Sequence, residues 1–162
     1  MIIKSVLTPF LFGLVGIFAF APFSIEFLIF VSYIYLINEL ISHKKASFLR
    51  ILFWGIGHWG FGMSWIIVSV YYYGETTIAI SALIYILLIM ILALVFTYPL
   101  ILINKLLLNV KINNTFIKIF IISTLLLISE TSRYFLLNGV PWLIPGNIFI
   151  CLLYTSDAAD DR

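Results

Sequence analysis

The feature that most constrains this chain is a series of long apolar runs that fill almost all of it. A bilayer core of about 30 Å needs roughly 20 apolar residues in a single helix. Runs of about this length cover residues 2–21, 23–42, 51–71, 77–103 and 116–136. Because backbone groups within lipid must find partners inside their own segment, each run is predicted to be a helix. The predicted fold class is all-α, a polytopic transmembrane helical bundle with about five spans, formed by residues 1–153.

Composition favours lipid as the solvent and excludes several kinds of site. Apolar residues make up 64% of the sequence and charged residues only 10%, with a mean hydropathy of +1.19, which is typical of membrane proteins. The sequence has no basic and aromatic patch of the kind found in nucleic-acid grooves, so nucleic acid is not an expected partner. The single cysteine, Cys151, excludes an internal disulfide and a Cys-x-x-Cys metal or redox site. No cofactor is predicted.

The first two runs are predicted to form an uncleaved hairpin. Lys4, the apolar run after it and Ala19-Phe20-Ala21 imitate a secretory signal with a small-residue cleavage site. Pro22 follows the apparent cleavage position directly, and a second apolar run begins at once. We therefore interpret residues 2–42 as two helices separated at Pro22, where a proline cannot continue the helical hydrogen bonds.

The distribution of positive charge predicts the topology. Basic residues lie before the first run, between the second and third, and around the connection between the fourth and fifth: Lys4, Lys44, Lys45, Arg50, Lys105, Lys111 and Lys118. The connections at Pro22-Phe23 and at residues 72–75 carry neither Lys nor Arg. By the positive-inside rule the N-terminus is predicted to be cytoplasmic, and residues 139–142 emerge on the opposite face.

The third run is the least generic, because it combines aromatic and small residues. On a 3.6-residue helix one stripe holds Trp54, His58, Phe61 and Trp65. Glycines flank this stripe on both sides, at Gly55, Gly57, Gly60 and Gly62. Small residues let neighbouring helices approach closely, so these glycines are predicted to serve helix packing. Packing is favoured over a ligand role for the aromatic stripe.

Three features inside or beside the runs have competing interpretations. Gly55-x-Gly57-x-x-Gly60 matches the dinucleotide fingerprint in letters, but no strand precedes it, so a cofactor loop is not predicted. His58 within a span raises a functional hypothesis. A hydrogen bond to a neighbouring helix is favoured, because no second ligand residue lies at metal-binding spacing. Glu39 and His43, four residues apart, predict an ion pair at a helix end.

The end of the fifth run carries a second group of candidate residues. Glu130 and Arg133 lie one helical turn apart and are predicted to pair where the fifth span meets the outer interface. Pro141 and Trp142 follow, and Trp favours the headgroup level of a bilayer. These four residues are a candidate interface or lipid-entry cluster. Simple anchoring of the helix end is an equally good interpretation.

Cys151 and the residues after it are predicted to take no part in chemistry. A reactive thiolate needs a base or a cation nearby, and the surrounding residues 148–153 supply neither. Residues 154–162 change abruptly from apolar to acidic where a further span is expected. We interpret this tail as non-native or frame-shifted.

Three blocks in fixed order resemble the apolipoprotein N-acyltransferase family, over roughly residues 10–150. The first is Phe20-Ala21-Pro22, at the turn of the hairpin. The second is the Trp-Gly-rich third run, whose matching positions are Trp54, Gly55, Gly57, Gly62, Trp65, Ser69, Tyr73 and Gly74. The third is the Glu-x-x-Arg and Gly-x-Pro-Trp pattern at Glu130, Arg133, Gly139, Pro141 and Trp142, with Val140 in place of the family's Phe. Tyr134, where the family often has Gly, and residues 145–147 depart from the pattern.

The resemblance implies a membrane domain of an enzyme that acylates bacterial lipoproteins. It implies a phospholipid as acyl donor, a diacylated apolipoprotein as acceptor and the bacterial inner membrane as the location. The family's catalytic Glu, Lys and Cys belong to a later nitrilase-like domain. No residue of this chain matches them, so no catalytic residue is predicted here and the fragment alone is expected to be inactive.

Two other interpretations stay open at the level of sequence. One is a membrane module without catalysis of its own, acting as an anchor or partner subunit. The other is a transporter fragment. Transporters tend to show broken helices in corresponding halves and charges within the membrane, and neither pattern is found in this sequence.

Overall fold

The computed structural model describes residues 2–41, 47–109, 114–136 and 142–149, and these residues form helices without any strand. The helices are α1 (Ile2–Ile17), α2 (Phe27–Ile41), α3 (Phe48–Gly62), α4 (Trp65–Tyr73), α5 (Ile78–Asn109) and α6 (Thr115–Leu136). A short helical segment at residues 145–149 follows. The predicted all-α class is confirmed for the described part of the chain.

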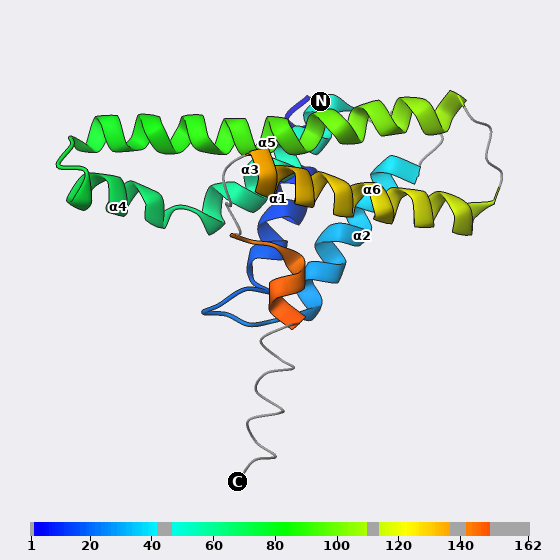
Figure 1. The fold of residues 1–162 in the computed structure, drawn as a ribbon, viewed down its shortest axis with the longest axis horizontal. Helices are drawn as coiled ribbons and strands as arrows, with labels where there is room; N and C mark the ends of the chain where they lie inside the picture. The colour runs from blue at the N-terminus through cyan, green and yellow to red at the C-terminus, as the bar shows by residue number, and fades with distance from the viewer. Residues whose placement is uncertain (1, 42–46, 110–113, 137–141, 150–162) are drawn as a thin grey trace, which may run out of the picture.

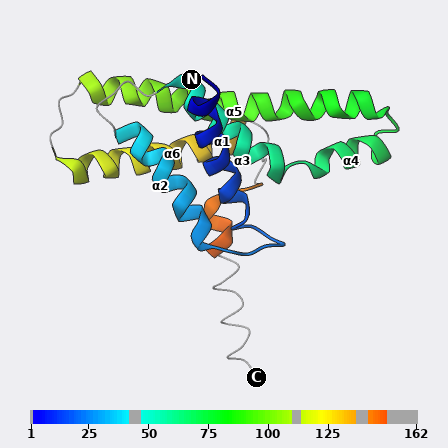
Figure 2. The ribbon, with the colours of Figure 1, turned by 180° about the vertical axis from the view of Figure 1, so that it is seen from behind.

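The helices are arranged around α3 and the longest helix, α5. In Figure 1, α4 lies beneath the N-terminal half of α5 and α6 runs back beside its C-terminal half, and Figure 2 shows the same arrangement from behind. Helix α1 leads away from α5 towards the segment 142–149, and α2 returns from there to α5. The closest pairing is between α1 and α3, and α3 also packs against α5. Helix α3 is therefore the central element, between α1 and α5.

Side-chain hydrogen bonds fix several helix ends. Asn114 Oδ1 accepts the N–H of Phe116 at 2.9 Å and so caps the start of α6. At the end of α2, the carbonyl of Leu40 accepts a hydrogen bond from Asn104 Nδ2 of α5 at 3.1 Å. Asn104 is buried. This bond satisfies a carbonyl that the last turn of α2 leaves without a partner inside the helix.

The third predicted span is broken, and this corrects the sequence prediction of one helix over residues 51–71. Helices α3 and α4 meet at a bend of 53° at Met63 and Ser64. Two glycines in the last turn of α3, Gly60 and Gly62, weaken helix formation at this point. Trp65 begins a new helix, so it does not continue the stripe of Trp54 and His58.

The first two helices are also shorter than predicted. Helix α1 ends at Ile17, four residues before the predicted end of the first run, and α2 begins only at Phe27. Turns from Phe18 onward close this connection, with backbone N–H groups of Phe18 and Phe20 donating to carbonyls three residues earlier. The hairpin expected around Pro22 is therefore present with a longer connection.

Glu39 pairs with Arg50 of α3, a contact that the sequence does not predict. Its Oε2 atom lies 3.0 Å from Arg50 Nη2 of α3, and the same Arg50 nitrogen donates to the hydroxyl of Tyr35 at 2.8 Å. His43 lies outside the described residues. The predicted pair of Glu39 with His43 therefore stays a prediction.

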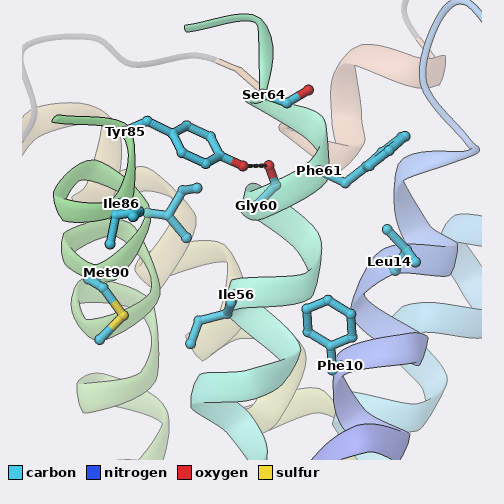
Figure 3. Close-up of a pocket in the computed structure, with 10 residues that line it drawn as sticks. Phe10, Leu14, Ile56, Gly60, Phe61, Ser64, Tyr85, Ile86 and Met90 are labelled. Atoms are coloured by element: carbon cyan, nitrogen blue, oxygen red, sulfur yellow. Dashed lines mark hydrogen bonds between the residues drawn. The ribbon is translucent and has the colours of Figure 1, made fainter. Parts of the chain in front are cut away.

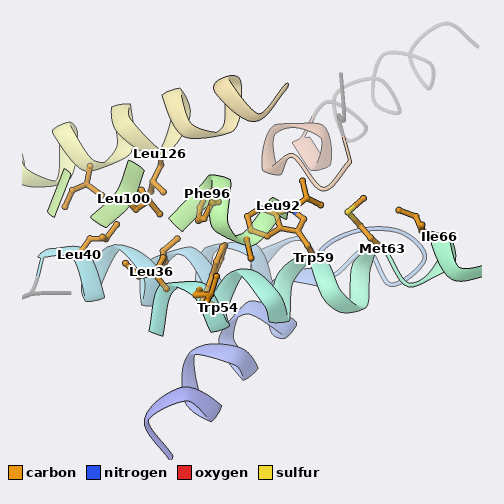
Figure 4. Close-up of a cluster of buried hydrophobic side chains, with 14 residues drawn as sticks. Leu36, Leu40, Trp54, Trp59, Met63, Ile66, Leu92, Phe96, Leu100 and Leu126 are labelled. Carbon is orange, nitrogen blue, oxygen red and sulfur yellow. The ribbon is translucent and has the colours of Figure 1, made fainter. Parts of the chain in front are cut away.

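A core of aromatic and aliphatic side chains joins α2, α3, α5 and α6. Trp54, Trp59 and Phe96 are fully buried at its centre, and Figure 4 shows them between leucines from the neighbouring helices. The Phe96 ring lies 5.5 Å from that of Trp54 and 5.0 Å from that of Trp59, between centroids. Such aromatic contacts favour one arrangement of α3 against α5.

Most of α5 nevertheless faces outward. Its segment Ile78–Leu102 is long and apolar enough to cross a membrane, and only 22% of its most apolar window is buried within the protein. Among the described residues this is one such helix, or one of two if α3 and α4 form a single bent span. A helix that is apolar on all sides is typical of a membrane span or of the core of a larger protein. The prediction of about five spans and of a cytoplasmic N-terminus is not tested by these features.

Candidate functional site

An apolar pocket lies between α1, α3 and α5. Its volume is about 460 Å³, within the range of roughly 300–1,000 Å³ usual for ligand sites. Ten residues line it: Phe10 and Leu14 from α1, Ile56, Gly60 and Phe61 from α3, Ser64 from the break, and Tyr85, Ile86, Ile89 and Met90 from α5. Figure 3 shows these side chains around the space beside Gly60.

Two hydroxyl groups are the polar side-chain groups of this lining. Tyr85 Oη donates a hydrogen bond to the carbonyl oxygen of Gly60 (Figure 3). The break in the helix explains why this carbonyl is available, because the N–H of Ser64 bonds to Phe61 instead of to the residue four positions earlier. Tyr85 thus satisfies a backbone carbonyl that the end of α3 exposes. The hydrogen of its hydroxyl is taken up by this bond.

The glycines of α3 occupy different surroundings. A Cβ atom at Gly57 would collide with the backbone carbonyl of Phe10 in α1, and one at Gly13 of α1 would collide with the carbonyl of Trp54. At Gly55 a Cβ would lie 2.9 Å from the Trp59 ring and 3.2 Å from Ala93 of α5. The absence of side chains thus allows α1 and α5 to approach α3 closely.

Gly60 and Gly62 differ from each other as well. A Cβ at Gly62 would meet side-chain atoms of Leu143 and Ile17, the latter at 2.8 Å. A Cβ at Gly60 would meet nothing within 4 Å. Gly60 therefore makes no close helix contact that a side chain would disturb, and the open space beside it belongs to the pocket.

His58 is buried among aromatic rings rather than in the pocket. Its imidazole stacks on Trp54 with centroids 5.1 Å apart, and Tyr33 approaches it edge-on. Nδ1 lies 3.4 Å from the carbonyl oxygen of Gly13 in α1. This geometry fits the interpretation of His58 as a residue that links two helices.

Glu130 is also buried, on α6. Its Oε1 atom accepts a hydrogen bond from the hydroxyl of Tyr33 in α2 at 3.3 Å. The bond joins two helices that are far apart in sequence. Arg133 belongs to α6, but its side chain is outside the described part of the structure, so the predicted pair with Glu130 stays a prediction.

Trp142 contacts a different part of the molecule. Its ring meets that of Trp65 edge-on, with centroids 5.1 Å apart. Trp65 begins α4 directly after the break. Pro141 and Cys151 lie outside the described residues, as does the tail 154–162. Within the described ranges no group of three His, Cys, Asp or Glu side chains is placed to hold a metal ion.

Sequence reasoning missed Tyr33, Tyr85 and Gly13. Each lies in an apolar run where it resembles an ordinary membrane residue. Tyr85 and Tyr33 gain their roles from carbonyl and carboxylate groups on other helices, which local patterns do not reveal. Gly13 carried a usable signal, since small residues in one predicted span suggest a close neighbour in another.

Comparisons with known proteins agree on one family. The family model described as "Apolipoprotein N-acyltransferase N-terminal domain" matches residues 12–160, a range that includes most of the acidic tail. A protein named apolipoprotein N-acyltransferase from Haemophilus influenzae is 32% identical over 132 residues, which are 81% of this chain and 24% of that protein. The protein of the same name from Haemophilus ducreyi is 28% identical over 143 residues, 88% of this chain and 27% of that protein. The chain thus spans about a quarter of the length of these relatives.

Proposed function

Because this chain belongs to the apolipoprotein N-acyltransferase N-terminal domain family, we propose that it forms the membrane part of an enzyme that acylates bacterial lipoproteins. The observation that carries the proposal is the family match over residues 12–160. The three ordered sequence blocks, which span the hairpin turn, the third run and the end of the fifth run, support it. The proposed location is the bacterial inner membrane, crossed several times.

The proposed reaction has two steps on a cysteine of the family's catalytic domain. The thiolate attacks the acyl ester of a phospholipid, so that a thioester forms and a lysophospholipid leaves. The α-amine of a diacylglyceryl-cysteine at the lipoprotein N-terminus then attacks the thioester, which forms an amide, releases the thiolate and gives up one proton to a base. A carboxylate acts as that base and a lysine stabilises the oxyanion, as in other activated-nucleophile sites. No residue of this chain is assigned to these three roles.

The task proposed for this chain is to hold the catalytic domain at the membrane and to present lipid to it. The exposed apolar surface of α5 supports the first part. The pocket between α1, α3 and α5 supports the second, since its lining suits a hydrocarbon chain.

The end of the fifth predicted span is proposed as the outer rim of the lipid path. Trp142, packed on Trp65 at the break, favours the headgroup level, where its ring is in apolar surroundings and its N–H meets water. Glu130, Arg133 and Pro141 belong to the same proposal. The bond between Tyr33 and Glu130 gives Glu130 the added task of holding α6 on α2.

A chimera tests this function. Residues 12–153, without the acidic tail, would replace the corresponding N-terminal part of the Haemophilus influenzae relative. The purified chimera, given phospholipid and a diacylglyceryl-cysteine lipopeptide, is expected to release lysophospholipid and to add one acyl group to the peptide, as mass spectrometry would detect. The control is the unmodified relative. A chimera that is folded and membrane-inserted but transfers no acyl group would contradict the proposal.

A further inference from the structure

We propose that Leu143 is a positioning residue, whose side chain latches the bend between α3 and α4 and thereby holds Trp142 against Trp65. The latch itself follows from contacts around the bend. Its importance for acyl transfer rests on the proposed function, which assigns Trp142 to the outer rim of the lipid path.

The side chain of Leu143 lies where two helices end. Gly62 is the last residue of α3, and Ile17 is the last residue of α1. A Cβ atom at Gly62 would collide with Cδ1 of Leu143 and would lie 2.8 Å from Cδ1 of Ile17. The space that Gly62 leaves beside its backbone is therefore filled by these two side chains, and it forms a seat for Leu143.

Trp142 and Leu143 contact opposite sides of the bend. Leu143 lies on Gly62, which precedes the bend, and the Trp142 ring meets the ring of Trp65, the first residue of α4, with centroids 5.1 Å apart. The bend of 53° lies between Gly62 and Trp65. Two adjacent residues thus hold the end of one helix and the start of the next. A change in the bend angle would break at least one of these two contacts.

The backbone of Leu143 also indicates a task for its side chain. Its φ is 59°, in the left-handed region, which bulky residues avoid. A residue stays in such a conformation only where its surroundings determine it. Glycine would adopt the same φ without a steric cost. The seat on Gly62 supplies the contacts that offset this cost for a leucine.

The far end of the segment 142–149 is fixed on the connection between α1 and α2. Ile148 packs against Ala19, and both are buried. The ring of Phe149 lies 5.6 Å from that of Phe30, between centroids. Figures 1 and 2 show the segment, in orange, beside this connection. The latch is therefore held from behind, so its two residues stay at the bend.

The test is fluorine NMR of the intact protein in lipid nanodiscs, with 5-fluorotryptophan at its four tryptophans. Trp65 reports the latch, because its ring lies in the ring-current field of Trp142. Trp54 and Trp59 are fully buried in the core and report folding. The variant Trp142→Leu gives the resonance of Trp65 without its partner ring, as the reference for an open latch.

Leu143→Gly is the deciding variant, because it removes the side chain while it suits the positive φ. The resonance of Trp65 is expected to move to its position in Trp142→Leu, and those of Trp54 and Trp59 to stay in place. Leu143→Met keeps an apolar side chain of similar volume. This variant is expected to keep the spectrum of the unmodified protein.

The seat is tested from the other side by Gly62→Leu. Its side chain would occupy the place of the Leu143 side chain, so the same shift of Trp65 is expected. The matched control is Gly146→Leu, in the same segment as Leu143, because a Cβ there meets nothing within 4 Å. This control is expected to leave the Trp65 resonance unchanged.

Two spectra would overturn the latch. One is an unchanged Trp65 resonance in both Leu143→Gly and Gly62→Leu. The other is a shift of Trp54 and Trp59 together with Trp65 in Leu143→Gly, because Leu143 would then support the whole core rather than the bend.

Acyl transfer by the chimera separates the latch from the proposed function. Leu143→Gly is expected to lower transfer by about tenfold or more, because small displacements at a distance cost rate, and Leu143→Met to retain it. Loss of transfer without the shift of Trp65 would contradict the latch. The shift with unchanged transfer would contradict the assignment of Trp142 to the lipid path, and a chimera without any transfer would contradict the proposed function alone.

Discussion

At the scale of single residues, the glycines of α3 are distinguished by what lies opposite them. The sequence predicts that Gly55, Gly57, Gly60 and Gly62 face neighbouring helices, because small residues on both flanks of an aromatic stripe suit close approach. Residue type alone cannot tell a glycine pressed against backbone from one that borders empty space. Gly57 lies against the carbonyl of Phe10, which cannot move without shifting α1, whereas Gly60 has open space. Only the position of α1, set by long-range packing, separates the two.

Alanine at these two positions is therefore expected to have opposite effects on stability. Gly57→Ala forces α1 away from α3, and overpacking of this kind costs about 1–3 kcal/mol. Gly60→Ala meets no obstacle and gains up to about 1 kcal/mol from helix propensity. The midpoint of thermal unfolding in detergent should fall for the first variant and rise or stay constant for the second. Equal shifts in both would show that the contact between α1 and α3 is not as close as described.

At the scale of elements, the break between α3 and α4 is the main departure from the sequence prediction. The apolar run of residues 51–71 is continuous, so hydropathy alone predicts one span. The run contains no proline, and the sequence predicts that its glycines serve helix packing. Besides the two glycines that weaken the helix, contacts from elsewhere stabilise the bend: Tyr85 of α5 bonds to the Gly60 carbonyl, and Leu143 and Ile17 lie next to Gly62. A tyrosine 25 residues away leaves no local signal at the position it stabilises.

Removal of the Tyr85 hydroxyl is expected to weaken the bend, and it adds no polar side-chain group to the pocket. Tyr85→Phe leaves the Gly60 carbonyl without its donor, and an unsatisfied group of this kind costs about 1–3 kcal/mol. Tyr98→Phe, on an exposed position of α5, is the control and should be nearly neutral. The free energy of unfolding in mixed detergent would measure both. A Tyr85→Phe variant as stable as the control would mean that the break holds its geometry without this bond.

At the scale of the whole molecule, composition and run length predict the all-α class, and the order of three motif blocks predicts the family. Both rest on features that are local or additive along the chain. The pocket depends on how α1, α3 and α5 meet, and the pairing of Tyr33 with Glu130 depends on how α2 meets α6. No periodicity within one run specifies these contacts. The prediction placed Glu130 with Arg133 on one helix face, because neighbours one turn apart are visible in sequence. The structure adds a contact from α2, the hydroxyl of Tyr33, which no pattern within the fifth run reveals.

The bend between α3 and α4 allows two topologies, and these place the residues after the bend on opposite sides of the membrane. If the pair crosses the membrane as one broken span, reporters fused after Lys45 and Lys111 are cytoplasmic and those after Gly74 and Gly139 are periplasmic, as the lysine distribution predicts. If the 53° bend instead returns the chain to its starting side, a reporter after Gly74 is cytoplasmic. Helix α5 would then carry Lys105 and Lys111 to the outside, against the positive-inside rule. Alkaline phosphatase and green fluorescent protein fusions at these four sites would measure the side directly. We expect the alternating pattern, and a cytoplasmic signal at Gly74 or Gly139 would overturn the predicted topology.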